Sequence, residues 1–190
     1  MLHKSGKNPG MPLFAPPIIK KGDFTLFQTP TIMRYLGKKL GLFPKTEEQE
    51  AHADALMSFI TDFIAEGRLV FHARNFVESY YTQKEETAGH VKWFNDTRLP
   101  QFMNYLEAYL AFNLKTHPEG YFVGDTLTYA DIAVFHTLMA AESQFPEAWT
   151  EITKQTPSLL AFKDKIADIP KIKDYLASDR RGLFEGNSMM

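Results

Sequence analysis

The chain has 190 residues, of which 44% are hydrophobic, and a formal net charge of −2. This composition is that of an ordinary globular protein with room for a sizeable core, in one domain or two small ones. The near-neutral charge gives no argument for nucleic-acid binding, and the lack of cysteine excludes a disulfide framework, a thiolate metal site and a cysteine nucleophile.

Residues 1–13 show little periodicity and carry Lys4 and Lys7 but no acidic residue. They contain no continuous apolar segment, and prolines would break a presequence helix, so we expect a loop and no signal or transit peptide. No window of the sequence approaches the roughly 18 apolar residues of a membrane span. We therefore expect a cytoplasmic protein that has no membrane partner.

Two short apolar runs follow, on either side of a polar turn. The first is Ile18-Ile19, the turn is Lys20-Lys21-Gly22-Asp23, and the second run is Phe24-Thr25-Leu26-Phe27. Runs rich in strand-forming residues around a glycine-containing connection predict a β-hairpin.

A helix is predicted directly after this hairpin. Thr29 is a suitable N-cap, and Pro30 suits the first helical position, where its missing N–H has no partner to lose. Gly41 is placed to end the helix. Apolar residues recur between these signals at helical spacing, at Ile32, Leu36 and Leu40.

The junction between hairpin and helix has two possible roles. A helix N-terminus offers unpaired N–H groups and a partial positive charge, so it favours a carboxylate or phosphate, and here it lies beside Gln28 and Thr29. Alternatively, Thr29 only caps its own helix and Gln28 is merely exposed. The second role is the commoner one for such residues.

The rest of the sequence predicts helices. Thr46 and Gln49 have the spacing of a capping box before a long amphipathic helix, which we expect to continue to about Tyr81 with a bend near Gly67. Helical periodicity resumes over residues 90–113, with a kink or break at Pro100.

A second capping box, Thr128 with Asp131, opens a segment that is apolar on nearly every face as far as Ala141. We expect this helix to lie in the centre of a bundle. A further helix begins near Pro157, and a short last turn follows Pro170.

Three of these segments, in this order, resemble the cytosolic glutathione transferases. The resemblance spans roughly residues 15–178. It implies an α+β fold in two parts: the remnant of a thioredoxin-like domain (a β-hairpin plus helix) over residues 1–43, and an all-helical domain over residues 44–190. The motifs that carry it are the hairpin with its Gln-Thr junction (17–36), Phe-Val-Gly-Asp with the second capping box (122–131), and the closing helices (157–176).

The resemblance also implies roles for single residues. Pro17 falls on a cis-proline of the family, and the backbone of the next residue, Ile18, would hold the cysteinyl part of glutathione. Gln28 and Thr29 match a pair that holds the γ-glutamyl carboxylate. Asp62 matches an acid that meets the γ-glutamyl amino group across a homodimer interface, although alone it would be interpreted as a solvated helix residue. Thr128 and Asp131 keep a structural capping role.

One part of the family pattern is absent from the sequence. A complete member begins with a strand, a helix and a strand that carry the Tyr, Ser or Cys acting on the glutathione thiol. In the place of that unit this chain has residues 1–14, where Ser5 lies in no recognisable strand–helix turn and the first tyrosine is Tyr35. We therefore assign no catalytic residue and expect a truncated member, or a sheet edge that another chain covers.

The leading prediction is a glutathione transferase-like protein that binds glutathione and, if the missing unit is supplied, conjugates it to hydrophobic electrophiles. The alternative is a non-catalytic scaffold or dimerisation module, and a glutathione-dependent isomerase is a third, weaker possibility. The six histidines show no metal-binding spacing, so no metal is expected. Four aromatic residues are either core or the lining of an apolar site: Phe71, Tyr80, Tyr81 and Trp93.

Overall fold

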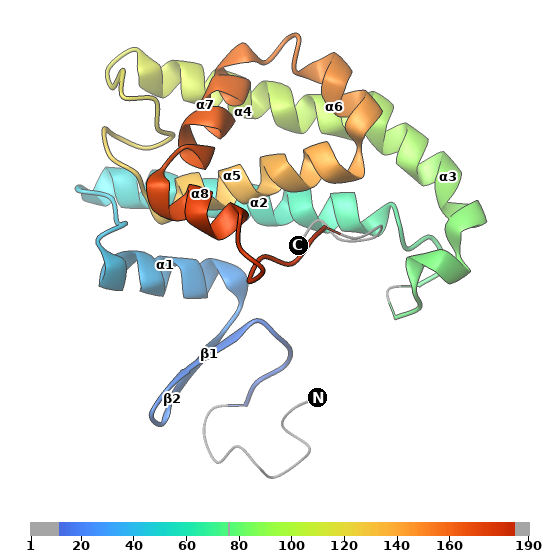
Figure 1. Ribbon diagram of the computed structural model, residues 1–190, viewed down its shortest axis with the longest axis horizontal. Coiled ribbons are helices and arrows are strands. Elements are labelled where there is room, and N and C mark those ends of the chain that lie inside the picture. The colour runs from blue at the N-terminus through green and yellow to red at the C-terminus, as the bar shows by residue number, and fades with distance from the viewer. Residues whose placement is uncertain (1–11, 76, 185–190) are drawn as a thin grey trace.

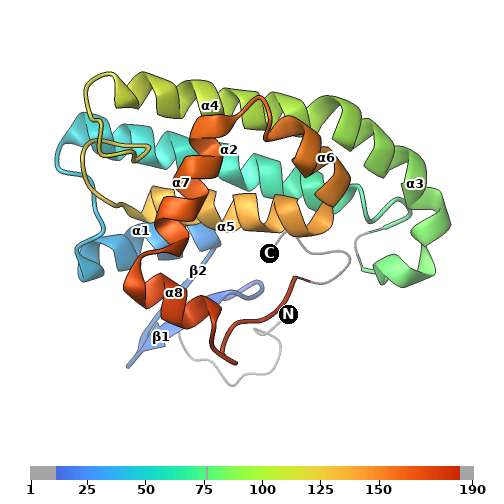
Figure 2. The same cartoon turned by 45° about the horizontal axis from the view of Figure 1, so that its top comes forward.

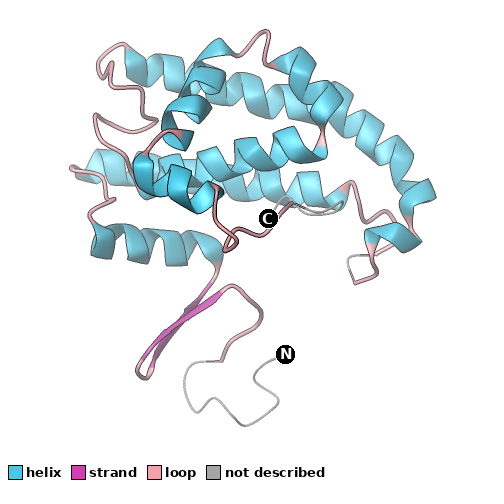
Figure 3. Cartoon of the chain, in the orientation of Figure 1, coloured by secondary structure: helices cyan, strands magenta, loops and turns pink. Residues whose placement is uncertain are grey.

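The computed structural model describes residues 12–75 and 77–184. A small hairpin lies at one edge of the molecule, and a layered set of helices forms the rest (Figure 1; Figure 3). The elements are β1 (Ile18–Lys21), β2 (Phe24–Phe27), α1 (Thr29–Leu40), α2 (Glu47–Leu69), η2 (Tyr80–Thr82), α3 (Lys84–Trp93), η3 (Phe94–Arg98), α4 (Leu99–Leu114), α5 (Tyr129–Gln144), α6 (Pro146–Ile152), α7 (Pro157–Ala167) and α8 (Pro170–Leu176).

The predicted β-hairpin is present. β1 and β2 are antiparallel, and their register runs from Ile18 opposite Phe27 to Lys21 opposite Phe24. Only Gly22 and Asp23 form the connection, and Gly22 has a φ of 59°, the left-handed conformation that a tight hairpin turn requires. Lys20 and Lys21, predicted in the turn, therefore belong to β1.

The first helix begins one residue before the predicted position. Gln28 is the N-cap, and its carbonyl accepts a hydrogen bond from the Ile32 N–H at 2.9 Å. The predicted cap at Thr29 is wrong: Thr29 is the first residue of α1, and no side chain caps the helix. The predicted end at Gly41 is confirmed by its φ of 74°.

Helix α2 begins as predicted and ends earlier. Thr46 Oγ1 accepts a hydrogen bond from the Gln49 N–H at 3.3 Å, as in a capping box. The returning bond is displaced by one residue, because Gln49 Oε1 accepts from the Lys45 N–H at 3.0 Å and not from the Thr46 N–H. The helix stops at Leu69, so the predicted continuation to about Tyr81 is wrong. The chain turns away over residues 70–75 and 77–79 before η2 begins.

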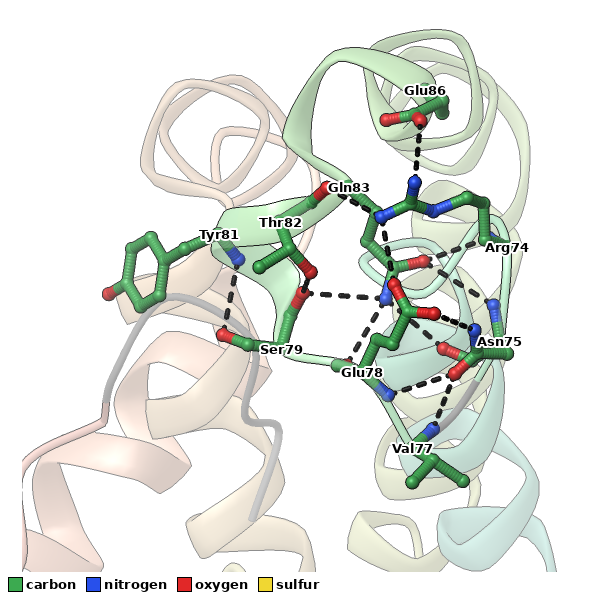
Figure 4. A network of polar contacts seen from close by, with 9 residues as sticks. All are labelled: Arg74, Asn75, Val77, Glu78, Ser79, Tyr81, Thr82, Gln83 and Glu86. Atoms are coloured by element: carbon green, nitrogen blue, oxygen red, sulfur yellow. Dashed lines mark hydrogen bonds and ion pairs between the residues drawn. The ribbon is translucent and has the colours of Figure 1, made fainter.

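Two amide side chains hold this turn (Figure 4). Gln83 is fully buried, accepts a hydrogen bond from the Arg74 N–H at 2.8 Å and donates to the carbonyls of Asn75 and Glu78, both at 3.1 Å. Asn75 Oδ1 accepts from the main-chain N–H groups of Val77 and Glu78 at 3.0 and 2.8 Å. Side chains thus replace the helical hydrogen bonds that α2 would have made by continuing.

The predicted break near Pro100 takes the form of a π-helical turn. Helices α3 and α4 are joined by η3, whose five residues have π-helical geometry, and Pro100 lies in the first turn of α4. Proline lacks the N–H that would continue an α-helical ladder through this point. The helical run therefore changes its hydrogen-bond pattern here without ending.

Helix α5 lies at the centre of the helical part, against α1, α2, α6 and α7 (Figure 2). Ten of its sixteen residues are buried, as the apolar character of the segment predicted. An aromatic cluster packs beside it, in which the rings of Phe63 and Phe102 stack at 4.5 Å. Helix α6, which the sequence analysis did not predict, adds the buried side chains of Trp149 and Ile152.

Helix α1 is bonded to the helical part through Tyr129 of α5. The Tyr129 N–H donates to the Leu42 carbonyl at 3.0 Å, and the Tyr129 hydroxyl donates to Asp54 Oδ1 of α2 at 2.6 Å. Arg34 of α1 donates to Oδ2 of the same carboxylate at 3.1 Å. Three elements that are distant in the sequence therefore meet at Asp54.

Replacing Tyr129 by phenylalanine should change how stability depends on pH. Burial and the hydrogen bond to Asp54 raise the pKa of Tyr129 above its ordinary value. The folded state thus keeps a proton that the unfolded chain loses near pH 10, so this stabilisation is complete below about pH 10 and is lost above it. We expect Tyr129→Phe to lower the free energy of unfolding by about 1 kcal/mol near neutral pH and to make its decline at high pH shallower.

Urea unfolding of both proteins at several pH values between about 8 and 11 measures this difference. The other tyrosines contribute equally to both curves, so the difference between the two curves reports on Tyr129 alone. Parallel curves over the whole range would contradict the assigned role of the Tyr129 hydroxyl.

Candidate functional site

The hairpin brings together the two pairs of residues that the sequence analysis singled out. Ile18 lies opposite Phe27 in the register. Pro17, which precedes Ile18, and Gln28, which follows Phe27, therefore lie at the same open end of the hairpin, where Thr29 begins α1. The peptide bond between Pro16 and Pro17 is cis. One end of the hairpin thus presents all four residues.

This end of the hairpin is accessible and carries an unusual backbone. Pro17, Gln28 and Thr29 are exposed, and Ile18 is half-buried. Gln28 has a φ of 73° and a ψ of 116°, the one non-glycine residue with positive φ in the described part of the chain. A non-glycine residue held in such a conformation stores of order 1–3 kcal/mol of strain, and strain of this kind clusters at functional sites.

The charge at the junction suits an anion. The first turn of α1 contains no acidic residue. The N–H groups at the start of the helix therefore face no competing carboxylate from the same turn, and the helix dipole adds a partial positive charge. A carboxylate is the ligand group that this end of α1 favours.

Asp62 is not part of this end of the hairpin. It is exposed on α2, and no hydrogen bond or ion pair joins it to Gln28 or Thr29 within residues 12–75 and 77–184. The role that the resemblance implies for Asp62 requires a second copy of the chain.

The four aromatic residues do not form one pocket. Phe71 is buried and its ring stacks on that of Phe145 at 5.4 Å, whereas Tyr81 and Trp93 are 67% and 54% exposed. Of the four, only Tyr80 lines an open groove of about 740 Å³ between α3, the start of α4 and α6. The walls of that groove are mixed, with both lysine and glutamate side chains.

A second cavity, of about 380 Å³, lies between β1 and α1, and the sequence analysis missed it. The lysine pairs of the hairpin and of α1 were the available signal, but their convergence depends on the fold. The residues that line the second cavity are Ile19, Lys20, Lys21, Phe24, Tyr35, Leu36 and Lys39.

No group of three or more potential metal ligands exists in the described ranges. No helix there is long and apolar enough to cross a membrane.

Comparison with known proteins gives consistent matches. A family model described as the C-terminal domain of glutathione S-transferase matches residues 71–179. The glutathione S-transferase of Plasmodium yoelii yoelii is 32% identical over 178 residues, which cover 94% of this chain and 75% of that protein. Glutathione S-transferase 4 of Caenorhabditis elegans is 31% identical over 172 residues, which cover 90% of this chain and 76% of that protein.

Solved structures show the same fold. The glutathione S-transferase Na-GST-3 of the hookworm Necator americanus aligns with a TM-score of 0.65 at 22% identity, over 89% of this chain and 76% of that one. The glutathione S-transferase Blo t 8 aligns with a TM-score of 0.69 at 20% identity, over 91% and 74%. The predicted fold class, a thioredoxin-like hairpin and helix followed by a helical domain, is confirmed.

Proposed function

Because the chain belongs to the glutathione S-transferase family, whose substrate is glutathione, we propose that it binds glutathione at the open end of its hairpin. The observation that carries this proposal is the strained Gln28 at the N-terminus of α1, next to Phe27, which lies opposite Ile18 in the hairpin. The cost of holding Gln28 at positive φ is understandable if the junction must present its amide and the adjacent N–H groups to a ligand.

The chemistry of glutathione fits these groups. Its γ-glutamyl carboxylate would accept hydrogen bonds from the Thr29 hydroxyl, the Gln28 amide and the N-terminal N–H groups of α1, which favour an anion. Its cysteinyl amide groups would pair with the backbone of Ile18, which follows the cis bond at Pro17. The γ-glutamyl carboxylate would thus be recognised by its charge, and the cysteinyl part by backbone hydrogen bonds.

The proposed reaction is conjugation of glutathione to a hydrophobic electrophile. It requires a thiolate, formed from a thiol whose unperturbed pKa is about 8.5, so a donor group must stabilise the anion. The second function, a non-catalytic scaffold, keeps the binding site and lacks this activation. A conjugation assay on the same protein sample that is used in the binding measurement distinguishes the transferase from the scaffold.

We further propose that two copies of the chain pair, with Asp62 of one copy meeting the glutathione amino group in the other. Its exposed position on α2 leaves the carboxylate available for such a contact. A cytoplasmic location is part of the same proposal, since a sequence without cysteine suits a reducing compartment.

Replacing Gln28 and Thr29 together by alanine should weaken glutathione binding by at least about tenfold, because two or more hydrogen bonds to the carboxylate are lost. Isothermal calorimetric titration with glutathione measures the change. The dipeptide cysteinylglycine, which lacks the γ-glutamyl group, should bind the unaltered protein and the double variant equally weakly.

The matched control is the double variant Thr126→Ala with Gln155→Ala, which removes the same side-chain types from exposed positions elsewhere. It should bind glutathione like the unaltered protein. Equal affinity of all three proteins would refute the site. Binding together with conjugation of a hydrophobic electrophile would establish the transferase, and binding without conjugation would establish the scaffold.

A further inference from the structure

The groove of about 740 Å³ between α3, the start of α4 and α6 lies on the side of the helical part away from the hairpin (Figure 1; Figure 2). Its lining residues all fall between Tyr80 and Gln155, inside the range that the family model matches. Small-molecule sites in proteins have volumes of roughly 300–1,000 Å³. This α3–α6 groove is therefore large enough for a small molecule.

The wall of the α3–α6 groove includes the π-helical turn η3 and the proline that follows it. Asn95 lies in η3 and Pro100 in the first turn of α4, and both line the groove. Single π-helical turns within α-helices are rare and are frequent at functional sites. The groups that this turn leaves without helical partners therefore bear on what the groove can bind.

The main-chain carbonyl of Asn95 has no helical donor. In an α-helical pattern it would accept a hydrogen bond from the Leu99 N–H, but that group donates to the Phe94 carbonyl. In a π-helical pattern it would accept from residue 100, a proline that has no N–H. Helical carbonyls point toward the C-terminal end of the helix, here toward Pro100. An unpaired acceptor therefore lies at this part of the wall.

The side chain of Asn95 supplies a second acceptor. Its Oδ1 is buried and has no hydrogen-bond partner within residues 12–75 and 77–184. A buried acceptor without a donor is destabilising. The terminal torsion of an asparagine side chain is broad and roughly two-fold, so the amide can turn to meet a donor in the groove. One residue thus offers a main-chain and a side-chain acceptor to the same ligand.

The charged groups of the groove favour a cation at this end. Three carboxylates and two lysines line the groove. Lys92 is already paired with Asp96, whereas Glu147 forms no ion pair in the part of the chain that the structure describes. The other lysine, Lys84, precedes Asn95 by eleven residues, which is about 16 Å along a helix axis. A positively charged donor therefore suits the Asn95 end of the groove.

We propose that the α3–α6 groove binds a small aromatic cation with adjacent N–H donors, of the aryl amidinium class. Two N–H groups of the amidinium would donate to the main-chain carbonyl and to Oδ1 of Asn95, as charge-assisted hydrogen bonds. The ring would pack on the apolar part of the wall, which includes Val91, Pro100 and Ala148. This binding does not depend on the proposed glutathione site.

Hydrogen bonding and charge argue against other small ligands. A carboxylate or phosphate has no donor for Asn95, and the carbonyl of Asn95 would repel it. An uncharged aryl amide can donate through its NH₂ group, but it lacks the positive charge that roughly doubles the strength of such hydrogen bonds. Both classes therefore serve as comparison ligands.

The first test is calorimetric titration of the full chain with benzamidine. One benzamidine should bind per chain, and excess glutathione should not displace it. Benzamide, the uncharged analogue, should bind at least about fivefold more weakly, and the anion benzoate should not bind.

Variants of the wall test the assigned contacts. Asn95→Leu removes Oδ1 at similar size and should weaken benzamidine binding by about tenfold. Asn95→Asp keeps an acceptor at that position and should bind benzamidine at least as tightly as the unaltered protein. Glu147→Gln should weaken binding by about two- to threefold. Glu85→Gln, the matched control on α3 outside the groove, should leave the affinity unchanged.

The open carbonyl is tested separately from the side chain. Pro100→Ala supplies an N–H that can bond to the Asn95 carbonyl, so it should weaken benzamidine binding by about three- to tenfold without lowering the temperature of thermal unfolding. Pro146→Ala is the matched control, because an N–H at the start of α6 has no helical partner.

Three results would each overturn the proposal. The first is no saturable binding up to about 10 mM benzamidine. The second is binding of benzamide or benzoate as tight as that of benzamidine. The third is an unchanged affinity for benzamidine in either Asn95→Leu or Pro100→Ala.

Discussion

Replacing Asp131 by alanine should lower the free energy of unfolding by about 3–5 kcal/mol, more than the loss of an ordinary helix cap. The Asp131 carboxylate is fully buried and accepts hydrogen bonds from the Phe122 N–H at 2.7 Å, the Thr128 N–H at 2.8 Å and the Thr128 hydroxyl at 2.7 Å. Alanine would leave these three donors in the core without a partner, and each buried unsatisfied donor costs about 1–3 kcal/mol.

Urea unfolding near neutral pH measures the loss. Thr46→Ala is the comparison, because Thr46 caps α2 through one exposed bond to the Gln49 N–H, and its removal should cost about 1 kcal/mol. Equal losses for the two variants would show that Asp131 acts only as a cap. A large loss for Asp131→Ala alone would support the wider role, in which it joins the 122–128 loop to α5.

Replacing Gly37 by alanine should destabilise the protein by about 2 kcal/mol, the cost of overpacking a tight contact. An added Cβ would lie 2.8 Å from Tyr129 Cδ1 and 2.9 Å from the Leu42 carbonyl oxygen. The second of these atoms belongs to the backbone and cannot rotate away, so α1 would have to move from α5.

Gly89→Ala in α3 is the matched control. A Cβ added at Gly89 would meet nothing within 4 Å, so alanine there should stabilise the protein by about 0.5–1 kcal/mol through its higher helix propensity. Thermal unfolding should therefore shift in opposite directions for the two variants. A shift in the same direction would mean that the contact between α1 and α5 is looser than the structure shows.

Much of the fold follows from local signals in the sequence. Gly22 supplies the positive φ of the hairpin turn and Gly41 that of the α1 terminus, and both conformations are intrinsic to glycine. The end of α2 was not predictable in this way. It depends on Gln83, which bonds the backbone of Arg74 and Asn75 eight or nine positions earlier, a contact that no helical period encodes.

The candidate site, like the fold, could be predicted from the sequence only in part. Its residue types are visible in the sequence, because Gln28 and Thr29 stand where a strand run meets a helical one. The strained backbone of Gln28 is not visible, since glutamine has no intrinsic preference for positive φ. Helix α6 was missed for a different reason: seven residues are too few to establish a period.

The attachment of α1 at Asp54 bears on how pieces of this protein could be exchanged with those of relatives. A chimera joined at residue 43 would take α1 from one parent and the helices that follow from the other, so that the partners of the Arg34–Asp54 and Leu42–Tyr129 bonds would come from different proteins. A junction between Phe27 and Thr29 would keep these bonds within one parent. The unit to graft onto a foreign hairpin is therefore the helical part together with α1.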